Sequence, residues 1–279
     1  MSTTRTSNIN LRVVIVIYNS ECEVSKSLSS ILKLNKKSLE LFVCDNSTRA
    51  EIISKNELFC SMQQVHYINM QGNAGLSRAY NRALMQISHD KWVVLFDQDT
   101  YVNPTYFDEL EKSILLHPNI YIHVPVVKSK GVQISPCLMI GHAVKRMKVT
   151  NYGLYSNITA INTGMAIRAS VFEKTGNYNE LIFLDHLDHY FIRNYRKFYK
   201  EIAVFHCILE QEFSDHDHSN IQVDVARFII YKKDFYIFCK DSISGHIYYM
   251  SKILYRTLKL TAAHKSFVFI EKLLEGPLK

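Results

Sequence analysis

Short, fully apolar segments alternate with amphipathic stretches over the first part of this chain. The segments at 11–17 (LRVVIVI) and 92–96 (WVVLF) are rich in β-branched and aromatic residues. Strands that are apolar on both faces are typical of a parallel sheet with helices on both sides. Between them, 24–32 and 75–87 repeat apolar side chains at helical spacing. The sequence therefore predicts an α/β fold with a mostly parallel sheet flanked by helices.

Further elements are predicted from capping and strand patterns. A Ser or Thr followed three residues later by Glu has the spacing of a capping box. Three such pairs each predict a helix start: Ser20 with Glu23, Thr48 with Glu51, and Ser170 with Glu173. Asn103 before Pro104 predicts another. We expect the remaining strands at 39–44, 65–68, 120–127, 159–167 and 201–206, hairpins between 128 and 157, and helices at 187–199 and beyond 221.

Charge and composition bound the partners. With 33 Lys and Arg against 26 Asp and Glu, the net charge is +7, which suits nucleotides, phosphates or acidic lipid headgroups. No nucleic acid is expected, because no nucleic-acid-binding module accompanies the charge. No apolar run reaches the roughly 18 residues of a membrane span. The polar first ten residues and six cysteines without a C-x-x-C pair predict a cytoplasmic chain with reduced thiols.

Polar residues directly follow three of the apolar strands. Tyr18 and Asn19 follow the first, Asp45 follows the second, and Asp97 follows the one at 92–96. Asn and Asp are also common in ordinary turns. In parallel sheets, however, ligands bind beyond the carboxyl ends of the strands. Three such positions at one sheet edge favour a binding site.

The segment Asp97-Gln98-Asp99 carries the clearest chemistry. In extended chain, residues two apart point the same way, so the two carboxylates can converge on one cation. Mg²⁺ or Mn²⁺ takes few carboxylates and completes its shell with water and phosphate oxygens. A D-x-D pattern alone is common by chance. At the end of a buried strand it indicates a metal–diphosphate site.

Two further patterns have functional and plain structural interpretations. The segment from Asn73 opens a helix whose N–H groups favour an anion, with Arg78 or Arg82 as an added cation; an ordinary helix start fits equally well. Asp185 and Asp188 lie three apart on a predicted helix, where one could act as a general base. Acidic residues are also common at helix starts, because the helix dipole favours them there.

The ordered motifs VVIVIYN, VCDNS, NAGLSRAYN, VVLFDQDT and NTGMAIRASVFEKTGNYNE-LIFLDHLDHY resemble glycosyltransferase family 2. The DQD form after Phe is similar to bacterial rhamnosyltransferases of surface polysaccharide assembly. The resemblance covers Leu11 to Tyr195, with a weaker echo at Tyr231–Asp234. It implies a GT-A fold over 1–220, with a nucleotide-binding half at about 1–100 and an acceptor half at about 101–220. A helical region at 221–279 follows.

The resemblance also implies roles for single residues. The nucleotide-sugar-binding residues would be Tyr18, Asn19, Asp45 (at the base), Asn73, Arg78, Arg82, Asp97 and Gln98. Asp99 and Asp97 would hold Mg²⁺ or Mn²⁺, Thr163 and Gly164 would border the acceptor, and Asp188, or less favourably Asp185, would be the catalytic base.

The chain departs from the family pattern at three places. Tyr190 stands where the family often has Glu, and Asn194 where it usually has Arg. A clean late metal ligand is missing, which leaves Gln211 and three histidines as candidates: His206, His216 and His218.

The resemblance implies an inverting transferase that uses a dTDP- or UDP-linked donor. dTDP-L-rhamnose is the first choice, and a UDP-hexose or UDP-galactofuranose is the alternative. The implied acceptor is a lipid-linked oligosaccharide of O-antigen, capsule or cell-wall assembly. The basic aromatic region after 221 is expected to contact an anionic membrane surface peripherally, or a second copy as a homodimer. Given the departures, a non-catalytic nucleotide-sugar-binding protein is a further alternative.

Overall fold

The computed structural model describes residues 9–211 and 220–276. The strands are β1 (Leu11–Ile17), β2 (Leu39–Asp45), β3 (His66–Asn69), β4 (Trp92–Asp97), β5 (Thr100–Tyr101), β6 (Ile122–Ser129), β7 (Val132–Ser135), β8 (Cys137–Ile140), β9 (Ala143–Arg146), β10 (Gly153–Ser156), β11 (Ile158–Thr159), β12 (Met165–Arg168) and β13 (Glu201–Gln211). The helices are α1 (Lys26–Lys33), α2 (Ala50–Met62), α3 (Leu76–Leu84), α4 (Tyr106–Leu116), α5 (Val171–Thr175), α6 (Leu187–Tyr195), α7 (Ile221–Cys239), α8 (Ile243–His264) and α9 (Val268–Leu274).

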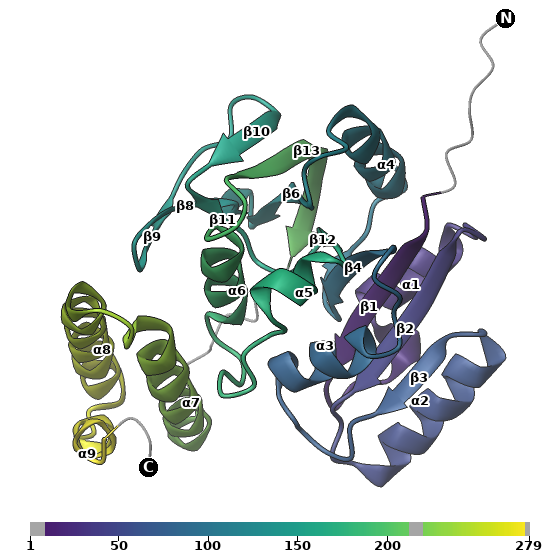
Figure 1. Ribbon diagram of the computed structural model, residues 1–279. Coiled ribbons are helices and arrows are strands. Elements are labelled where there is room, and N and C mark those ends of the chain that lie inside the picture. The colour runs from purple at the N-terminus through teal and green to yellow at the C-terminus, as the bar shows by residue number, and fades with distance from the viewer. Residues whose placement is uncertain (1–8, 212–219, 277–279) are drawn as a thin grey trace, which may run out of the picture.

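A central sheet organises the molecule (Figure 1). Its strands run in the order β10-β13-β6-β12-β4-β1-β2-β3, with β5 paired to β13 and β7 to β6, and β11-β8-β9 form a separate small sheet. The four strands β3, β2, β1 and β4 are parallel, as predicted. Beyond β4 the sheet is mixed, because β12 runs antiparallel to both β4 and β6.

The parallel strands bring their polar ends together. In the register of β1, Ile17 pairs with Asp45 on one side and Val16 pairs with Asp97 on the other. Most side chains of β1 and β4 are buried on both faces, which is the pattern that their apolar sequence predicts. The carboxyl ends of β1, β2 and β4 therefore share one edge.

Two of the predicted capping boxes are wrong. After Ser20 the chain forms only a short 3₁₀ turn at Cys22–Val24, and α1 begins after Ser25, whose Oγ accepts the Leu28 N–H. Thr48 does not cap α2, because its N–H and hydroxyl both donate to Asn19 Oδ1.

The other predicted helix starts are partly right. Ser170 does precede α5, but its side chain makes no capping hydrogen bond. α4 begins at Tyr106, two residues after Pro104, and the Asn103 side chain bonds the Ile208 carbonyl and the Thr105 hydroxyl rather than capping the helix.

The strand predicted at 159–167 is wrong in its middle. Its first residues belong to β11 in the small sheet, and its last belong to β12 in the central sheet. Gly164 makes the turn between them with φ +73°, where an added Cβ would lie 2.6 Å from Leu209 and 2.8 Å from Pro125. The strand β13 is longer than predicted and extends to Gln211.

The three C-terminal helices pack together at one end of the molecule (Figure 1). Their shared core is aromatic and includes Phe228, Phe235, Tyr249 and Phe269, so these rings pack inside the helical region. The helical C-terminal extension is thus confirmed, while its division from a domain at 1–220 stays a prediction. Within the described residues, no helix is both long and apolar enough to cross a bilayer.

Candidate active site

A cavity of 820 Å³ lies at the carboxyl ends of β1 and β4, between this edge, the loop before α6, and α7. Its polar lining residues are Tyr18, Asn46, Asn73, Asp97, Gln98, Asp99, Asn162, Asp185, His186, Asp188, His189, Gln211, Arg227 and Tyr231. A volume of this size matches a drug- or nucleotide-sized ligand. Residues far apart in the chain, such as Tyr18 and Tyr231, thus face one space.

The acidic pair Asp97 and Asp99 lines this cavity. Asp97 Oδ2 accepts the Thr163 hydroxyl at 2.6 Å and the Gln211 amide at 3.0 Å. Burial, reinforced by the neighbouring Asp99 charge, raises the pKa of Asp97 to about 6 against these hydrogen bonds. Two neighbouring carboxylates in a partly buried cavity wall favour a bound cation.

The side chain of Gln211 completes this acidic corner. Its Nε2 also lies 3.4 Å from Asp99 Oδ1, and its Oε1 is buried without a hydrogen-bond partner among the described residues. Two carboxylates and one orphaned amide oxygen are hard donors that fit Mg²⁺ or Mn²⁺, with diphosphate and water completing the shell. Within 9–211 and 220–276, no group of three His, Cys, Asp or Glu side chains could hold a metal without such help.

Of the histidines weighed as metal ligands, His206 is the one within the described residues, and it does not reach this corner. His206 packs against Tyr152, with ring centroids 4.5 Å apart, and does not line the cavity. His216 and His218 lie outside the described residues.

The loop after β1 borders the cavity through Tyr18, which is 47% exposed. Its N–H donates to Gln98 Oε1 at 2.9 Å, which ties the loop to the acidic segment. Asn19 has φ +47° and donates its N–H to Ser47 Oγ, so it braces the neighbouring loop rather than lining the cavity.

Asp45 lies beneath the cavity wall. It is fully buried and accepts hydrogen bonds from the Ser47 N–H, the Asn56 amide and the Tyr67 hydroxyl. The next residue, Asn46, lines the cavity instead. A role for Asp45 at the nucleotide base stays a prediction, and it would require these hydrogen bonds to rearrange.

The segment before α3 contributes Asn73 and Gly75 to the lining. Arg78 is exposed and lies 3.6 Å from Glu180, and Arg82 is exposed on the same helix. Neither arginine lines the cavity. Their predicted contact with phosphate therefore has no support from their present positions.

Gly75 joins the two sides of the cavity. An added Cβ would lie 2.6 Å from a ring carbon of Phe183 and 2.7 Å from its carbonyl oxygen, and φ is +85°. The following Leu76 N–H donates to this same carbonyl at 2.7 Å. Only glycine permits this approach of the loop at 183–189 to α3.

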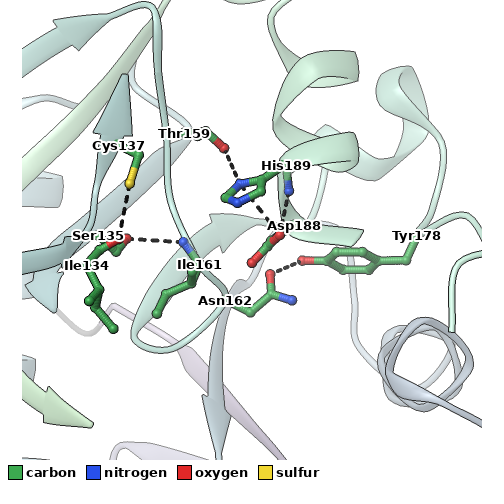
Figure 2. Close-up of polar contacts among 9 residues, drawn as sticks. All are labelled: Ile134, Ser135, Cys137, Thr159, Ile161, Asn162, Tyr178, Asp188 and His189. Atoms are coloured by element: carbon green, nitrogen blue, oxygen red, sulfur yellow. Dashed lines mark hydrogen bonds and ion pairs between the residues drawn. The ribbon is translucent and has the colours of Figure 1, made fainter. Parts of the chain in front are cut away.

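Asp188 stands in the first turn of α6 and lines the cavity. Its Oδ1 accepts the N–H of His189 at 2.7 Å, and the His189 ring lies between Asp188 and the Thr159 hydroxyl (Figure 2). Among the described residues, no cation side chain other than the His189 ring pairs with Asp188. A carboxylate at this place can accept a proton from a bound hydroxyl.

Asp185 has a different environment. Its Oδ1 accepts Arg227 Nη2 at 2.8 Å, across the cavity wall from α7. Burial raises the pKa of Asp185, and the charges of Arg227 and Arg256 oppose that rise. Because Asp185 is committed to an ion pair, its neighbour Asp188 is better placed to act as a base.

Asp234 on α7 holds the loop that carries these acids. It is fully buried, and its carboxylate accepts the backbone N–H groups of Phe183, Leu184 and Asp185 at 2.9, 2.7 and 2.9 Å. Neither this role nor that of Arg227 was predicted from the sequence. The weak family echo at Tyr231–Asp234 was the available signal.

Thr163 and Gly164 lie behind the cavity wall. Both are absent from its lining, where Ile161 and Asn162 stand instead, and the Asn162 side chain is held by the Tyr178 hydroxyl at 3.0 Å (Figure 2). Their predicted place beside the acceptor stays a prediction. The structure gives Thr163 a direct contact with Asp97.

Two curated proteins are similar to this chain in sequence. The dTDP-rhamnosyl transferase RfbF of Shigella flexneri is 25% identical over 65% of this chain and 61% of its own length. Glycosyltransferase GlyA of Streptococcus pneumoniae is 33% identical over 38% of this chain and 15% of its own. The chain thus spans less than two thirds of either relative.

Solved structures show the same fold. The mannosyltransferase PcManGT of Pyrobaculum calidifontis, in complex with GDP-Man and Mn²⁺, superposes with a TM-score of 0.61 at 12% identity, covering 97% of this chain and 80% of that one. The sequence model of glycosyl transferase family 2 matches residues 12–176. The chain therefore belongs to glycosyltransferase family 2 and has a GT-A fold.

Proposed function

We propose that this chain is an inverting, metal-assisted transferase that moves a sugar from a nucleoside diphosphate to an acceptor hydroxyl. The observation that carries the proposal is the single cavity lined by both Asp97–Asp99 and Asp188. An acidic segment suited to a metal–diphosphate and a separate carboxylate suited to a general base thereby face one bound donor.

In the proposed reaction, Asp188 takes the proton of the acceptor hydroxyl. The freed oxygen forms a bond to the anomeric carbon, the bond from that carbon to the phosphate oxygen breaks, and the nucleoside diphosphate leaves with the electron pair. Asp97, Asp99 and Gln211 would hold a divalent cation, which when bound neutralises charge on the departing diphosphate. Tyr18 and Asn73, which border the same space, would contact the nucleotide.

For the donor we favour dTDP-L-rhamnose, because the relative RfbF is named a dTDP-rhamnosyl transferase. A UDP-hexose or UDP-galactofuranose is the alternative. The proposed acceptor is a lipid-linked oligosaccharide in surface polysaccharide assembly.

The proposal is tested with purified protein, a panel of dTDP- and UDP-sugars, and Mn²⁺ or Mg²⁺. We expect one donor to raise the melting temperature, since ligand stabilisation follows concentration over Kd, and to be consumed by transfer or hydrolysis. Asp99→Ala and Asp188→Asn should each lower turnover by at least about 100-fold. Asp90→Asn, at an exposed residue paired with Lys91, is the matched control.

Two results would contradict the proposal. Full turnover in either variant would remove the role of that residue. Donor binding without turnover in the wild type would leave only a nucleotide-sugar-binding protein.

The outer side of α8 supports a second part of the proposal, peripheral contact with an anionic bilayer. Ile243, Ile247 and Leu254 are 83%, 66% and 50% exposed at helical spacing on one side. The helix contains no Asp or Glu, and Lys252 and Lys259 are exposed beside this stripe. An apolar stripe on a helix whose charged side chains are all cations suits an acidic lipid surface.

Vesicle sedimentation tests this contact. Phosphatidylglycerol-containing vesicles should bind the wild type at low salt and release it at high salt, and phosphatidylcholine vesicles should bind it weakly. Ile247→Gln with Leu254→Gln should abolish the binding, whereas Lys37→Gln, on an exposed loop far from α8 in the chain, should not. Salt-independent dimers and no lipid binding would instead indicate a contact between copies.

A further inference from the structure

The ion pair between Asp185 and Arg227 leaves one polar atom of each partner unused. Arg227 Nη2 bonds Asp185 Oδ1 at 2.8 Å. Asp185 Oδ2 and Arg227 Nη1 are shielded from solvent and have no hydrogen-bond partner within the described residues. An unpaired buried polar atom costs about 1–3 kcal/mol, and native proteins rarely keep one without a ligand or water to pair it. Both residues line the cavity.

The chemistry of this pair selects a ligand class. It offers one hydrogen-bond acceptor and one donor, and its two charges compensate each other. The carboxylate would repel an anionic ligand, and the guanidinium would repel a cationic one. Two hydroxyl groups on neighbouring carbon atoms fit, since one donates to the carboxylate oxygen and the other accepts from the guanidinium N–H.

The pair is fixed before any ligand binds. The backbone of Asp185 is held by Asp234, and Arg227 projects from the same helix, α7. One turn further along α7, Tyr231 also lines the cavity, and the Arg256 guanidinium packs over its ring at 3.9 Å from the centroid. A preformed pair loses little side-chain entropy on binding.

We propose that Asp185 and Arg227 form a subsite that recognises two neighbouring hydroxyls of the acceptor sugar. Asp185 precedes Asp188 by three residues in the same cavity wall, so a sugar held there presents another hydroxyl to the base. The subsite rests on the proposed function. It makes Asp185 a specificity-determining residue and leaves proton removal to Asp188.

The test measures sugar binding by saturation-transfer NMR on protein loaded with UDP or dTDP and Mg²⁺. The probes are the methyl glycosides of rhamnose, galactose and glucose, each with analogues lacking one hydroxyl. At least one glycoside should bind the wild type, and loss of one of two neighbouring hydroxyls should weaken its binding about tenfold, the effect of roughly 1.4 kcal/mol. Asp185→Asn and Arg227→Gln should weaken the parent glycoside similarly and remove the penalty for the deoxy analogue.

The matched control is another Asp–Arg pair, Arg193 with Asp241 at 2.6 Å, which does not line the cavity. Asp241→Asn should leave sugar binding unchanged. The subsite is overturned if the two variants bind the glycosides as the wild type does, or if nucleotide-loaded wild type binds none of them. Failure to bind either nucleotide would instead count against the proposed function.

Discussion

The two walls of the cavity are built in different ways. On the donor side, Tyr18 and the segment Asp97–Asp99 come directly from the ends of adjacent parallel strands. On the acceptor side, Asp185 and Asp188 belong to a loop and a helix start that three backbone hydrogen bonds tie to Asp234, about fifty residues later. Strand topology fixes the first wall, and a single buried carboxylate fixes the second.

Because the two walls have different supports, the acceptor wall can be changed without the donor wall. The loop at 183–189 contacts the donor side mainly through the approach of Phe183 to Gly75 and Leu76. Substitutions in α7 should therefore affect sugar transfer and leave nucleotide binding intact. Substitutions at the approach itself should affect both.

The largest effect is expected for Asp234→Asn. An amide offers one acceptor oxygen to three N–H donors, so at least one buried donor loses its partner. The displaced loop should lower kcat for transfer about 100-fold, because misplaced catalytic groups lose that much. The Kd for UDP or dTDP, measured by calorimetry, should change less than about twofold.

A parallel loss of nucleotide binding in Asp234→Asn would contradict the independent support of the two walls, because each wall would then depend on the other. Asp241→Asn on the same side of the molecule is the control and should change neither quantity, since Asp241 pairs with Arg193 away from the cavity.

The next largest effect is expected for Gly75→Ala. Its Cβ would lie 2.6–2.7 Å from Phe183 atoms at φ +85°, which should lower the free energy of unfolding by about 2–3 kcal/mol. Both nucleotide affinity and transfer should fall. Gly72→Ala has φ +113° but open space around it, so it isolates the backbone strain. Denaturant unfolding of both variants measures the difference in stability. Equal losses of stability would mean that the contact with Phe183 adds nothing to the cost of Gly75→Ala.

The smallest effect concerns a buried histidine in the sheet, away from both walls. Burial lowers the pKa of His123 to about 4, so between roughly pH 6.5 and pH 4 the unfolded chain binds a proton that the folded chain does not. Folding stability from this group is therefore lost as pH falls. When the pH falls from 7 to 5, the free energy of unfolding of His123→Gln should rise by about 1–2 kcal/mol relative to that of the wild type.

Denaturant unfolding at the two pH values measures this difference. The raised pKa of Asp97 acts in the opposite direction but cancels between the two proteins. A pH-independent difference would mean that His123 takes up its proton at the same pH in the folded chain as in the unfolded chain.

The donor wall was largely predictable from sequence. The strand at Leu11–Ile17 was predicted at its observed bounds, because a run of buried β-branched residues leaves little choice of element. Topology then placed Asp97 and Tyr18 at one edge. The predictions for Arg78 and Arg82 gained no support, since their side chains point to solvent and, for Arg78, to Glu180.

The acceptor wall was less predictable because its contacts are long-range. Nothing local marks Asp234 as a partner of Phe183. The capping boxes at Ser20 and Thr48 failed for a related reason: tertiary hydrogen bonds and turns took the positions that local spacing assigned to helix starts.

The central claim is that the acidic corner and Asp188 face the same bound donor. A crystal structure of the protein with its nucleotide donor and Mn²⁺, phased to show the anomalous signal of manganese, tests it most directly. We predict a manganese peak beside Asp97 and Asp99, with the anomeric carbon between that peak and Asp188. Manganese bound elsewhere, or a donor whose sugar points away from Asp188, would contradict it.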